Sequence, residues 1–459
     1  MTTKKNKKRT RPSIGKSRSR ITVGFIALGC PKNMVDSERM LAQIAQAGFI
    51  INQNTDNADV VVINTCGFIA PAKAEAIDAI RHAIEQKQKG RVRKIVVAGC
   101  LPQRLGKKLL SEAGQIDAIV GLEHRDHIAD IIKNTLLADA PAYFLTPTYK
   151  SLCDDRVRLR ITPPHYAYLR ISEGCSRNCS FCTIPSIRGK ARSKPASLIL
   201  AEAQELVASG AVELNIIAQD ITTYGRDLKT KYALPGLLGE LAKIPRLGWI
   251  RLLYLYPTGI NEQLIEMVAR CDKIVNYFDI PIQHVNPQIL KAMRRPHSKD
   301  RICTLIERLR TRLPDCVLRT TLIIGFPGET DARFDELLDF IKWARFDHLG
   351  CFTFYPEQGT PAAKFPRQIP NKVKQMRREK LMLTQQQICF EKNKTRIGSS
   401  LTCLIDKTEK GGVAKGRFFG QAPEIDPVCI IKECSADPGT FIGAKVTGTR
   451  NYDLLCEQI

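Results

Sequence analysis

The sequence predicts an α/β protein with three folded parts: a small doubly wound domain, a partial barrel of six βα units, and a closed five-stranded β-barrel. Short apolar runs rich in Val and Ile alternate with helical patterns in two separate series. Beyond residue 400 the pattern changes to short strands separated by Gly-rich turns. A chain of 459 residues is also too long for one ordinary domain.

The first series lies within residues 21–140 and predicts the doubly wound domain. Its strand candidates are apolar throughout, as expected for parallel strands buried on both faces. They are Thr22–Leu28, Asp59–Asn64 and Lys94–Ala98, and helical patterns such as Ser37–Ala47 and Ala72–Gln86 lie between them. Residues 1–20, before this domain, hold nine Lys or Arg and no acid. They lack the apolar side chains needed to form a core, so we expect a disordered basic tail.

The second series lies within residues 160–394 and predicts six βα units, two fewer than a closed eight-unit barrel. Its strand candidates are Tyr166–Ser172, Leu214–Gln219, Ile250–Leu255, Tyr277–Ile282, Leu318–Gly325 and His348–Tyr355. Helical patterns separate them, for example Leu198–Ala208, Glu262–Ala269, Ile302–Leu313 and Arg333–Ala344, and residues 372–394 read as a charged connecting helix. Active sites of such barrels lie at the carboxyl ends of the strands.

The last part, residues 395–459, predicts a five-stranded barrel of the oligonucleotide-binding kind. Its strand candidates are Leu401–Asp406, Val413–Phe418, Cys429–Ile431, Ala444–Thr447 and Leu454–Cys456.

The charge of the chain is strongly positive but unevenly distributed. The formal net charge is +24, of which the first twenty residues supply +9, whereas residues 395–459 hold eight basic and eight acidic side chains. A basic protein attracts phosphate-rich partners, although simple solubility explains the charge equally well. No apolar stretch approaches the roughly 20 residues that span a bilayer. Sixteen cysteines are too sparse for a disulfide scaffold, and reduced thiols favour a cytoplasmic location.

The strongest motif is a group of three cysteines, Cys175, Cys179 and Cys182, spaced CxxxCxxC directly after the first strand of the second series. Three thiolates on one loop can bind three irons of a 4Fe-4S cluster and leave the fourth iron open for a substrate. A zinc site or chance are the alternatives, but zinc normally has a fourth protein ligand and none stands nearby at the usual spacing.

This segment resembles the motif of the radical S-adenosylmethionine superfamily, with the aromatic Phe181 before the last cysteine. The resemblance implies that S-adenosylmethionine binds the open iron and is cleaved there to a 5′-deoxyadenosyl radical. It also implies that Phe181 lies near the adenine; packing of the loop onto the barrel is compatible with that role.

A second group of cysteines stands just past the ends of strands in the first series: Cys30, Cys66 and Cys100. In a doubly wound sheet these positions converge on the crevice where ligands bind, so we expect a second three-thiolate cluster site. Gly29 and Gly99 would let the backbone approach a bulky cluster closely. The alternative is three independent buried cysteines.

Two cluster sites on one chain resemble the methylthiotransferase family, and the match extends to the C-terminal barrel, which resembles a TRAM domain. The segment Cys30-Pro31-Lys32-Asn33 resembles the branch that acts on a ribosomal protein, whereas the tRNA-modifying relatives differ after the cysteine. The barrel segment Gly416–Asp426 also resembles this branch, with departures at Gln421 and Pro427.

The resemblance implies a reaction, its cofactors and its partners. One aspartate of small ribosomal subunit protein number twelve would receive a methylthio group at its β-carbon. Two S-adenosylmethionine molecules and two 4Fe-4S clusters would be used, with electrons from a protein such as flavodoxin or ferredoxin, on the free substrate or on the ribosome. The alternatives are a tRNA adenosine methylthiotransferase and a non-catalytic iron–sulfur electron carrier or scaffold. The balanced charge of the last barrel favours a basic protein partner, which Glu424 and Asp426 would contact.

Three polar residues, Asp220, Gln283 and His284, lie at predicted strand ends and could either contact a ligand or cap helices and bridge loops. Thr330 is a predicted N-cap, and its strand-to-helix turn lacks the ending of a phosphate loop.

Overall fold

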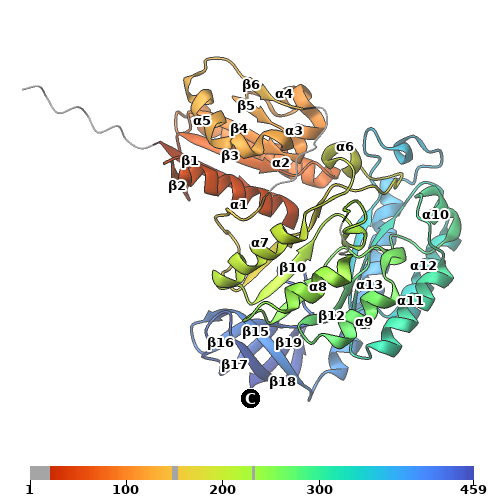
Figure 1. Ribbon diagram of the computed structural model, residues 1–459. Coiled ribbons are helices and arrows are strands. Elements are labelled where there is room, and N and C mark those ends of the chain that lie inside the picture. The colour runs from red at the N-terminus through yellow and green to blue at the C-terminus, as the bar shows by residue number, and fades with distance from the viewer. Residues whose placement is uncertain (1–20, 147–153, 230–232) are drawn as a thin grey trace, which may run out of the picture.

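The computed structural model describes residues 21–146, 154–229 and 233–459, so the predicted basic tail lies outside the described residues. The chain forms three bodies in sequence order, with the N-terminal domain and the C-terminal barrel at opposite ends of the central domain (Figure 1). Across the described ranges, we find no helix with the length and apolarity that a membrane span requires.

The N-terminal domain is a parallel sheet of six strands in the order β2-β1-β3-β4-β5-β6. The strands are β1 (Thr22–Ala27), β2 (Ile50–Asn52), β3 (Val60–Thr65), β4 (Lys94–Gly99), β5 (Ala118–Val120) and β6 (Ala142–Phe144). The helices are α1 (Pro31–Gln46), α2 (Ala70–Gln88), α3 (Cys100–Leu105), α4 (Leu109–Ala113) and α5 (Ile128–Leu137). Val60 and Val62 pack toward α1 and α5, whereas Val61 and Ile63 pack toward α2. The predicted doubly wound fold is therefore confirmed, and its strand order reverses between β1 and β3.

The sequence patterns missed parts of this domain. Strands β2, β5 and β6 have only three residues each, which is too short for a recognisable period. Helix α1 begins at Pro31, six residues before the predicted start at Ser37. Proline at the first helical position is favourable because its missing N–H would have no partner there, and this signal marks the true start.

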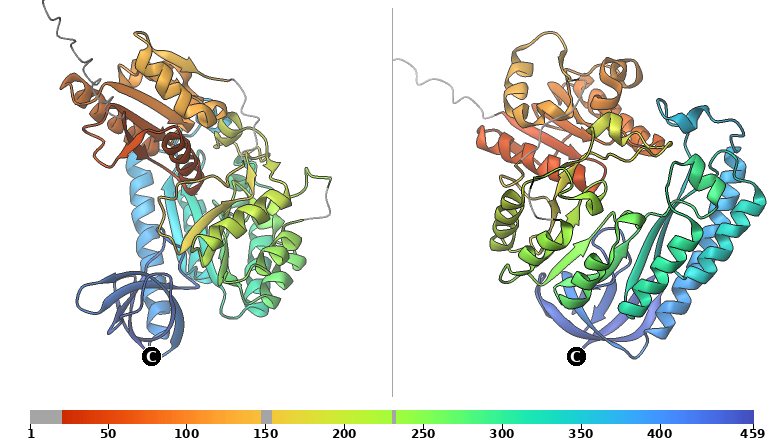
Figure 2. Two further views of the ribbon diagram at one scale, coloured as in Figure 1. Left: turned by 60° about the vertical axis from the view of Figure 1, so that its left-hand side comes forward. Right: turned by 45° about the vertical axis from the view of Figure 1, so that its right-hand side comes forward.

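The central domain is an open parallel sheet of six strands in the order β14-β13-β12-β11-β10-β7, which confirms the predicted partial barrel. The strands are β7 (Tyr166–Arg170), β10 (Glu213–Ile217), β11 (Trp249–Leu252), β12 (Ile274–Asp279), β13 (Val317–Ile324) and β14 (His348–Thr353). The helices are α6 (Ile184–Arg188), α7 (Ala196–Ala208), α8 (Leu234–Ala242), α9 (Glu262–Arg270), α10 (Pro287–Ala292), α11 (Lys299–Arg312), α12 (Asp331–Ala344) and the long connecting helix α13 (Asn371–Thr395). Helices α7 to α12 cover the outer face, and α13 runs along the domain toward the C-terminal barrel (Figure 2).

The C-terminal domain is a closed barrel with the order β15-β16-β17-β19-β18, and all five predicted strands are present. The strands are β15 (Ser400–Glu409), β16 (Val413–Phe418), β17 (Cys429–Lys432), β18 (Phe441–Arg450) and β19 (Asp453–Gln458). The barrel packs against the amino ends of the central strands. Arg417 forms a buried ion pair of 2.7 Å with Glu213, and the rings of Trp249 and Phe441 lie 4.8 Å apart. The barrel therefore closes the end of the central sheet that is opposite to the expected site.

The expected partner contact through Asp426 is wrong. The carboxylate of Asp426 is 2% exposed and accepts hydrogen bonds from the Tyr277 hydroxyl (2.6 Å) and the backbone N–H of Ala422 (2.9 Å). Glu424 is likewise engaged within the chain, since it accepts a hydrogen bond of 2.8 Å from the Tyr166 hydroxyl. Asp426 thus helps to dock the barrel onto the central domain, whereas Glu424 also stays exposed to solvent.

Asp426→Asn is expected to lower the free energy of unfolding by about 1–3 kcal/mol, because the amide loses the negative charge and one of the two buried acceptor oxygens. Urea unfolding measures this cost. Asp437→Asn, an exposed acid of the same barrel, is the control and should change little. Equal stability of the two variants, with weaker substrate modification only for Asp426→Asn, would instead favour a role in partner contact.

Candidate functional site

The first group of cysteines lies on the loop between β8 (Ser172–Glu173) and α6, at the carboxyl end of β7. Two backbone N–H groups point at its sulfurs: that of Arg177 lies 3.4 Å from Cys175 Sγ, and that of Ile184 lies 3.4 Å from Cys182 Sγ. Burial raises the pKa of the Cys182 thiol to about 12, while the Ile184 N–H lowers it. Such N–H···S contacts are typical of sulfurs that ligate an iron–sulfur cluster.

Contacts to neighbouring strand ends hold this loop in place. The Arg177 side chain donates to the Asp220 carboxylate at 2.9 Å and stacks on the Tyr256 ring at 3.8 Å. Asp220 also caps the turn that follows β10 by accepting from the N–H of Thr222 at 3.0 Å. Of the two roles weighed for Asp220, the structure shows capping and loop bridging.

The second group of cysteines follows three strands that lie side by side, β1, β3 and β4. Cys30 is the N-cap of α1, Cys66 directly follows β3, and Cys100 opens α3. Their position is the point where the strand order reverses, which is the expected ligand crevice of such a sheet. Burial raises the pKa of the Cys100 thiol to about 12; Arg188 lowers this pKa, and the neighbouring Cys66 and Cys30 thiols raise it. The three thiols are thus close enough to influence one another.

Glycine is needed beside this group because neighbouring strand ends approach each other closely there. Gly29 and Gly99 have φ angles of +96° and +102°, which disfavour other residues. A Cβ at Gly29 would lie 2.7 Å from Cys66 Cβ, and one at Gly99 would lie 2.4 Å from Asn64 Oδ1. The close approach is therefore between neighbouring strand ends.

Within the described ranges, no three His, Cys, Asp or Glu side chains form a group that could hold a metal ion. In a four-iron cluster each cysteine binds a different iron, so its ligands do not converge on one point. Three thiols in each group, on one loop in the first and at three strand ends in the second, fit that donor set.

The chain segments next to the two groups of cysteines meet at the boundary between the N-terminal and central domains. The Thr183 hydroxyl, next to Cys182, donates to the carbonyl of Phe68 in the loop that follows Cys66, at 3.3 Å. Arg188 of α6 donates to Cys100 Sγ at 3.2 Å. The segment that follows the Cys175–Cys182 loop therefore packs against the segments that carry Cys66 and Cys100.

A buried network of charges, not foreseen from the sequence, fixes this arrangement. Asp36 of α1 is paired with Arg125 (2.7 Å), Arg170 (2.6 Å) and Arg188 (3.0 Å), and Glu173 is paired with the last two at 2.8 and 3.0 Å. These side chains are no more than 4% exposed. Burial alone would raise the pKa of the Glu173 carboxyl, but three neighbouring guanidinium groups outweigh it and hold that pKa below its usual value.

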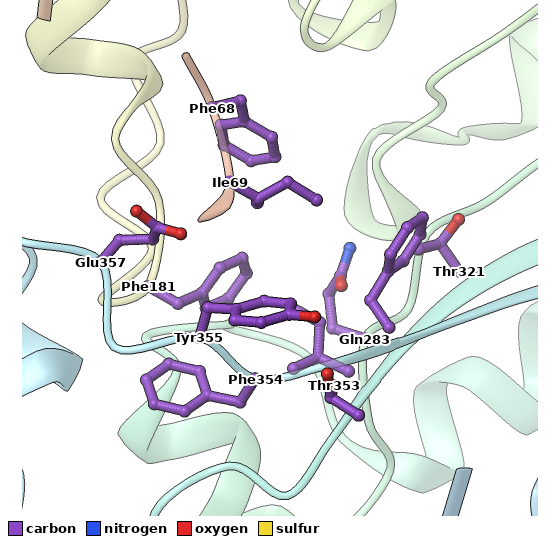
Figure 3. A pocket seen from close by; sticks show the side chains of 11 residues that line it. Phe68, Ile69, Phe181, Gln283, Thr321, Thr353, Phe354, Tyr355 and Glu357 are labelled. Atoms are coloured by element: carbon purple, nitrogen blue, oxygen red, sulfur yellow. The ribbon is translucent and has the colours of Figure 1, made fainter. Parts of the chain in front are cut away.

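A cavity of about 210 Å³ opens beside the Cys175–Cys182 loop. Phe68 and Ile69 enter it from the N-terminal domain, while Phe181 and Tyr355 lie on the opposite side (Figure 3). Phe181 also packs against the Phe354 cluster, so both roles weighed for it are compatible with its position. Gln283, whose φ is +70°, lines the cavity and points its amide inward.

The other two weak signals have structural roles. His284 is fully buried, lies 3.3 Å from the Glu329 carboxylate and accepts from the N–H groups of Val285 and Asn286. Thr330 caps α12 by accepting from the N–H of Arg333, as predicted.

Comparisons with known families match all three domains. The uncharacterized protein family UPF0004 matches residues 22–121, the radical SAM superfamily matches residues 169–341, and the TRAM domain matches residues 397–459. Among solved structures, the radical S-adenosylmethionine methyltransferase TsrM from Kitasatospora setae aligns with a TM-score of 0.54 over 75% of this chain and 77% of its own, at 13% identity. That likeness supports the fold.

Closer relatives match over almost the whole chain. The ribosomal protein uS12 methylthiotransferase RimO of Syntrophomonas wolfei subsp. wolfei is 42% identical over 438 residues, which is 95% of this chain and 100% of the relative. The protein of the same name from Geobacter sulfurreducens is 42% identical over 445 residues, 96% of this chain and 100% of the relative. These relatives do not favour the tRNA alternative.

Proposed function

This chain belongs to the family of ribosomal protein uS12 methylthiotransferases, and we propose that it attaches a methylthio group to the β-carbon of one aspartate of that protein. Family membership supports the reaction class and the protein substrate. The observation that carries the proposal is the contact of Thr183 and Arg188, which follow the Cys175–Cys182 loop, with the segments after β3 and β4 that carry Cys66 and Cys100.

The radical SAM domain implies an iron–sulfur cluster and S-adenosylmethionine. We propose one four-iron cluster on Cys175, Cys179 and Cys182 and a second on Cys30, Cys66 and Cys100, because each group offers three thiols and N–H or guanidinium donors to sulfur. When bound, these groups supply a hydrogen-abstracting radical and the transferred methylthio group.

The protein's own side chains bind, orient and shield the reactants. Phe68, Phe181 and Tyr355 give the cavity apolar walls that exclude water from a reactive centre. Gln283 and Thr321 add polar groups that can orient a ligand there. We place the adenine of S-adenosylmethionine against Phe181, as the resemblance implies.

The proposal includes a cytoplasmic location and a small electron-donating protein such as flavodoxin or ferredoxin. A ribosomal substrate supports the location, and reduced thiols suit it. The assay described below can be run with either the free ribosomal protein or the assembled ribosome as the substrate.

A substrate competition tests the function. Reconstituted enzyme receives unmodified ribosomal protein uS12 and unmodified tRNA together, and mass spectrometry follows the methylthio product. We expect product on the ribosomal protein and none on tRNA. Product on tRNA alone would overturn the proposal, as would a protein that leaves S-adenosylmethionine intact under reducing conditions.

A further inference from the structure

Lys32 is a buried cation at the boundary between the N-terminal and central domains. It is the second residue after Cys30, in the first turn of α1, and it is 7% exposed. Its Nζ lies 3.4 Å from the centre of the Tyr254 ring, a cation–π contact between the N-terminal and central domains.

No acidic side chain in the described part of the chain forms an ion pair with Lys32. Other buried cations have an acceptor within the chain. Lys194 lies 2.7 Å from Asp155 and 2.6 Å from Glu202. Lys374, which has no ion pair among the described residues, donates to the carbonyl of Phe354 at 2.7 Å. Buried charges are normally paired because an isolated one is costly. Lys32 departs from this rule at the boundary where the reaction is proposed to occur.

The surroundings of Tyr254 place Lys32 at the ends of the central strands. Tyr254 follows β11 and has a φ of +63°, a strained value that clusters at functional sites. Its backbone N–H donates to the Asp279 carboxylate at 3.0 Å. Asp279 is already paired with Arg319 at 3.0 Å, so its charge is balanced within the central domain.

The neighbouring residues of the same segment have structural roles that Lys32 lacks. Pro31 begins α1, and the Asn33 amide donates to the carbonyl of Leu28. An ammonium group has three N–H donors, so contact with a single tyrosine leaves donors for a ligand. A carboxylate is the group that best satisfies them.

We propose that Lys32 Nζ binds the side-chain carboxylate of the substrate aspartate. This inference rests on the proposed function and names the group that selects its substrate. The reacting β-carbon is bonded directly to that carboxylate, so a cation beside Cys30, at the boundary with the central domain, would hold the carbon in place. An adenine ring has no such charge, which makes Lys32 a specificity-determining residue against tRNA.

The test compares Lys32→Met, Lys32→Arg and the control Lys107→Met. Lys107 also stacks on a tyrosine, Tyr143, but at 4.8 Å and on the exposed surface of the N-terminal domain. Each variant is measured for kcat/KM on ribosomal protein uS12. Each is also measured for Kd with that protein and with a form whose target aspartate is Asn.

Lys32→Met is expected to lower kcat/KM about a hundredfold and to remove the preference in Kd for the aspartate form. Lys32→Arg should restore part of that preference, and Lys107→Met should behave as the wild type. Iron content should be kept, and the Tm should stay the same or rise because an unpaired buried charge is removed.

Three results would overturn the inference. A preference for the aspartate form that survives in Lys32→Met would show that another group binds the carboxylate. Loss of iron or a lowered Tm in Lys32→Met would make the residue a structural partner of Cys30. Absence of product on the ribosomal protein with wild-type enzyme would overturn the proposed function and this inference with it. The wild-type assay alone shows this outcome, so it is distinguished from a failure of the Lys32 inference.

Discussion

Replacing Cys175, Cys179 and Cys182 by Ala is expected to remove all cleavage of S-adenosylmethionine and roughly half of about eight irons in the reconstituted protein. The reason is that the open iron of this proposed cluster is the binding point for the cofactor. Iron analysis and detection of 5′-deoxyadenosine measure the two effects under reducing, oxygen-free conditions.

Replacing Cys30, Cys66 and Cys100 by Ala is the complementary experiment. It should remove the other half of the iron and leave some cleavage, because the first cluster lies on a different domain. A control variant changes Cys271 and Cys303, which are similarly half-buried but lie outside both loops, and should keep all iron. Full iron in the second triple variant would refute the argument from strand ends.

The fold was largely predictable because it depends on local patterns. Buried parallel strands are continuous apolar runs, so all six strands of the central sheet stood out. The five strands of the last barrel stood out too, although β15 and β18 extend to ten residues, beyond their predicted bounds. Parallel topology then carries distant residues to one edge, which is why Cys30, Cys66 and Cys100 could be grouped although more than thirty residues separate neighbouring ones.

Contacts between domains could not be predicted, because they depend on how finished domains pack. Asp36, Glu173 and Arg188 look like ordinary surface charges in the sequence, yet they are buried together. Asp426 was misjudged for the same reason: its docking partner, Tyr277, belongs to another domain. Neither the local periodicity of the sequence nor its charge counts show which residues of two domains will contact each other.

The buried charge network leads to the second large effect. Asp36 is 1% exposed, and its carboxylate forms ion pairs with the guanidinium groups of three arginines from three other elements. A buried ion pair is weak evidence for stability, because replacing all of its members by apolar residues is often neutral. Removing only one partner is different, since the remaining charges stay buried without compensation.

Asp36→Ala is therefore expected to lower the free energy of unfolding by about 3–5 kcal/mol. It should also loosen the N-terminal domain from the central domain, because Asp36 lies on α1 and two of its partners, Arg170 and Arg188, lie on β7 and α6. Urea unfolding measures the loss. Asp339→Ala is the control: its pair with Lys342 is 75% and 62% exposed, so the expected cost is within about 0.5 kcal/mol.

A double variant separates electrostatic frustration from simple loss of packing. In the Asp36→Ala background, Arg125→Met removes one of the cations that Asp36 had neutralised, so the second change should restore part of the lost stability. Arg125→Met alone should be destabilising, because it takes away the partner that lies 2.7 Å from Asp36. If the two losses simply add, the charges do not act as one network. The domain boundary would then have to be held by its hydrogen bonds, such as the one from Thr183 to Phe68.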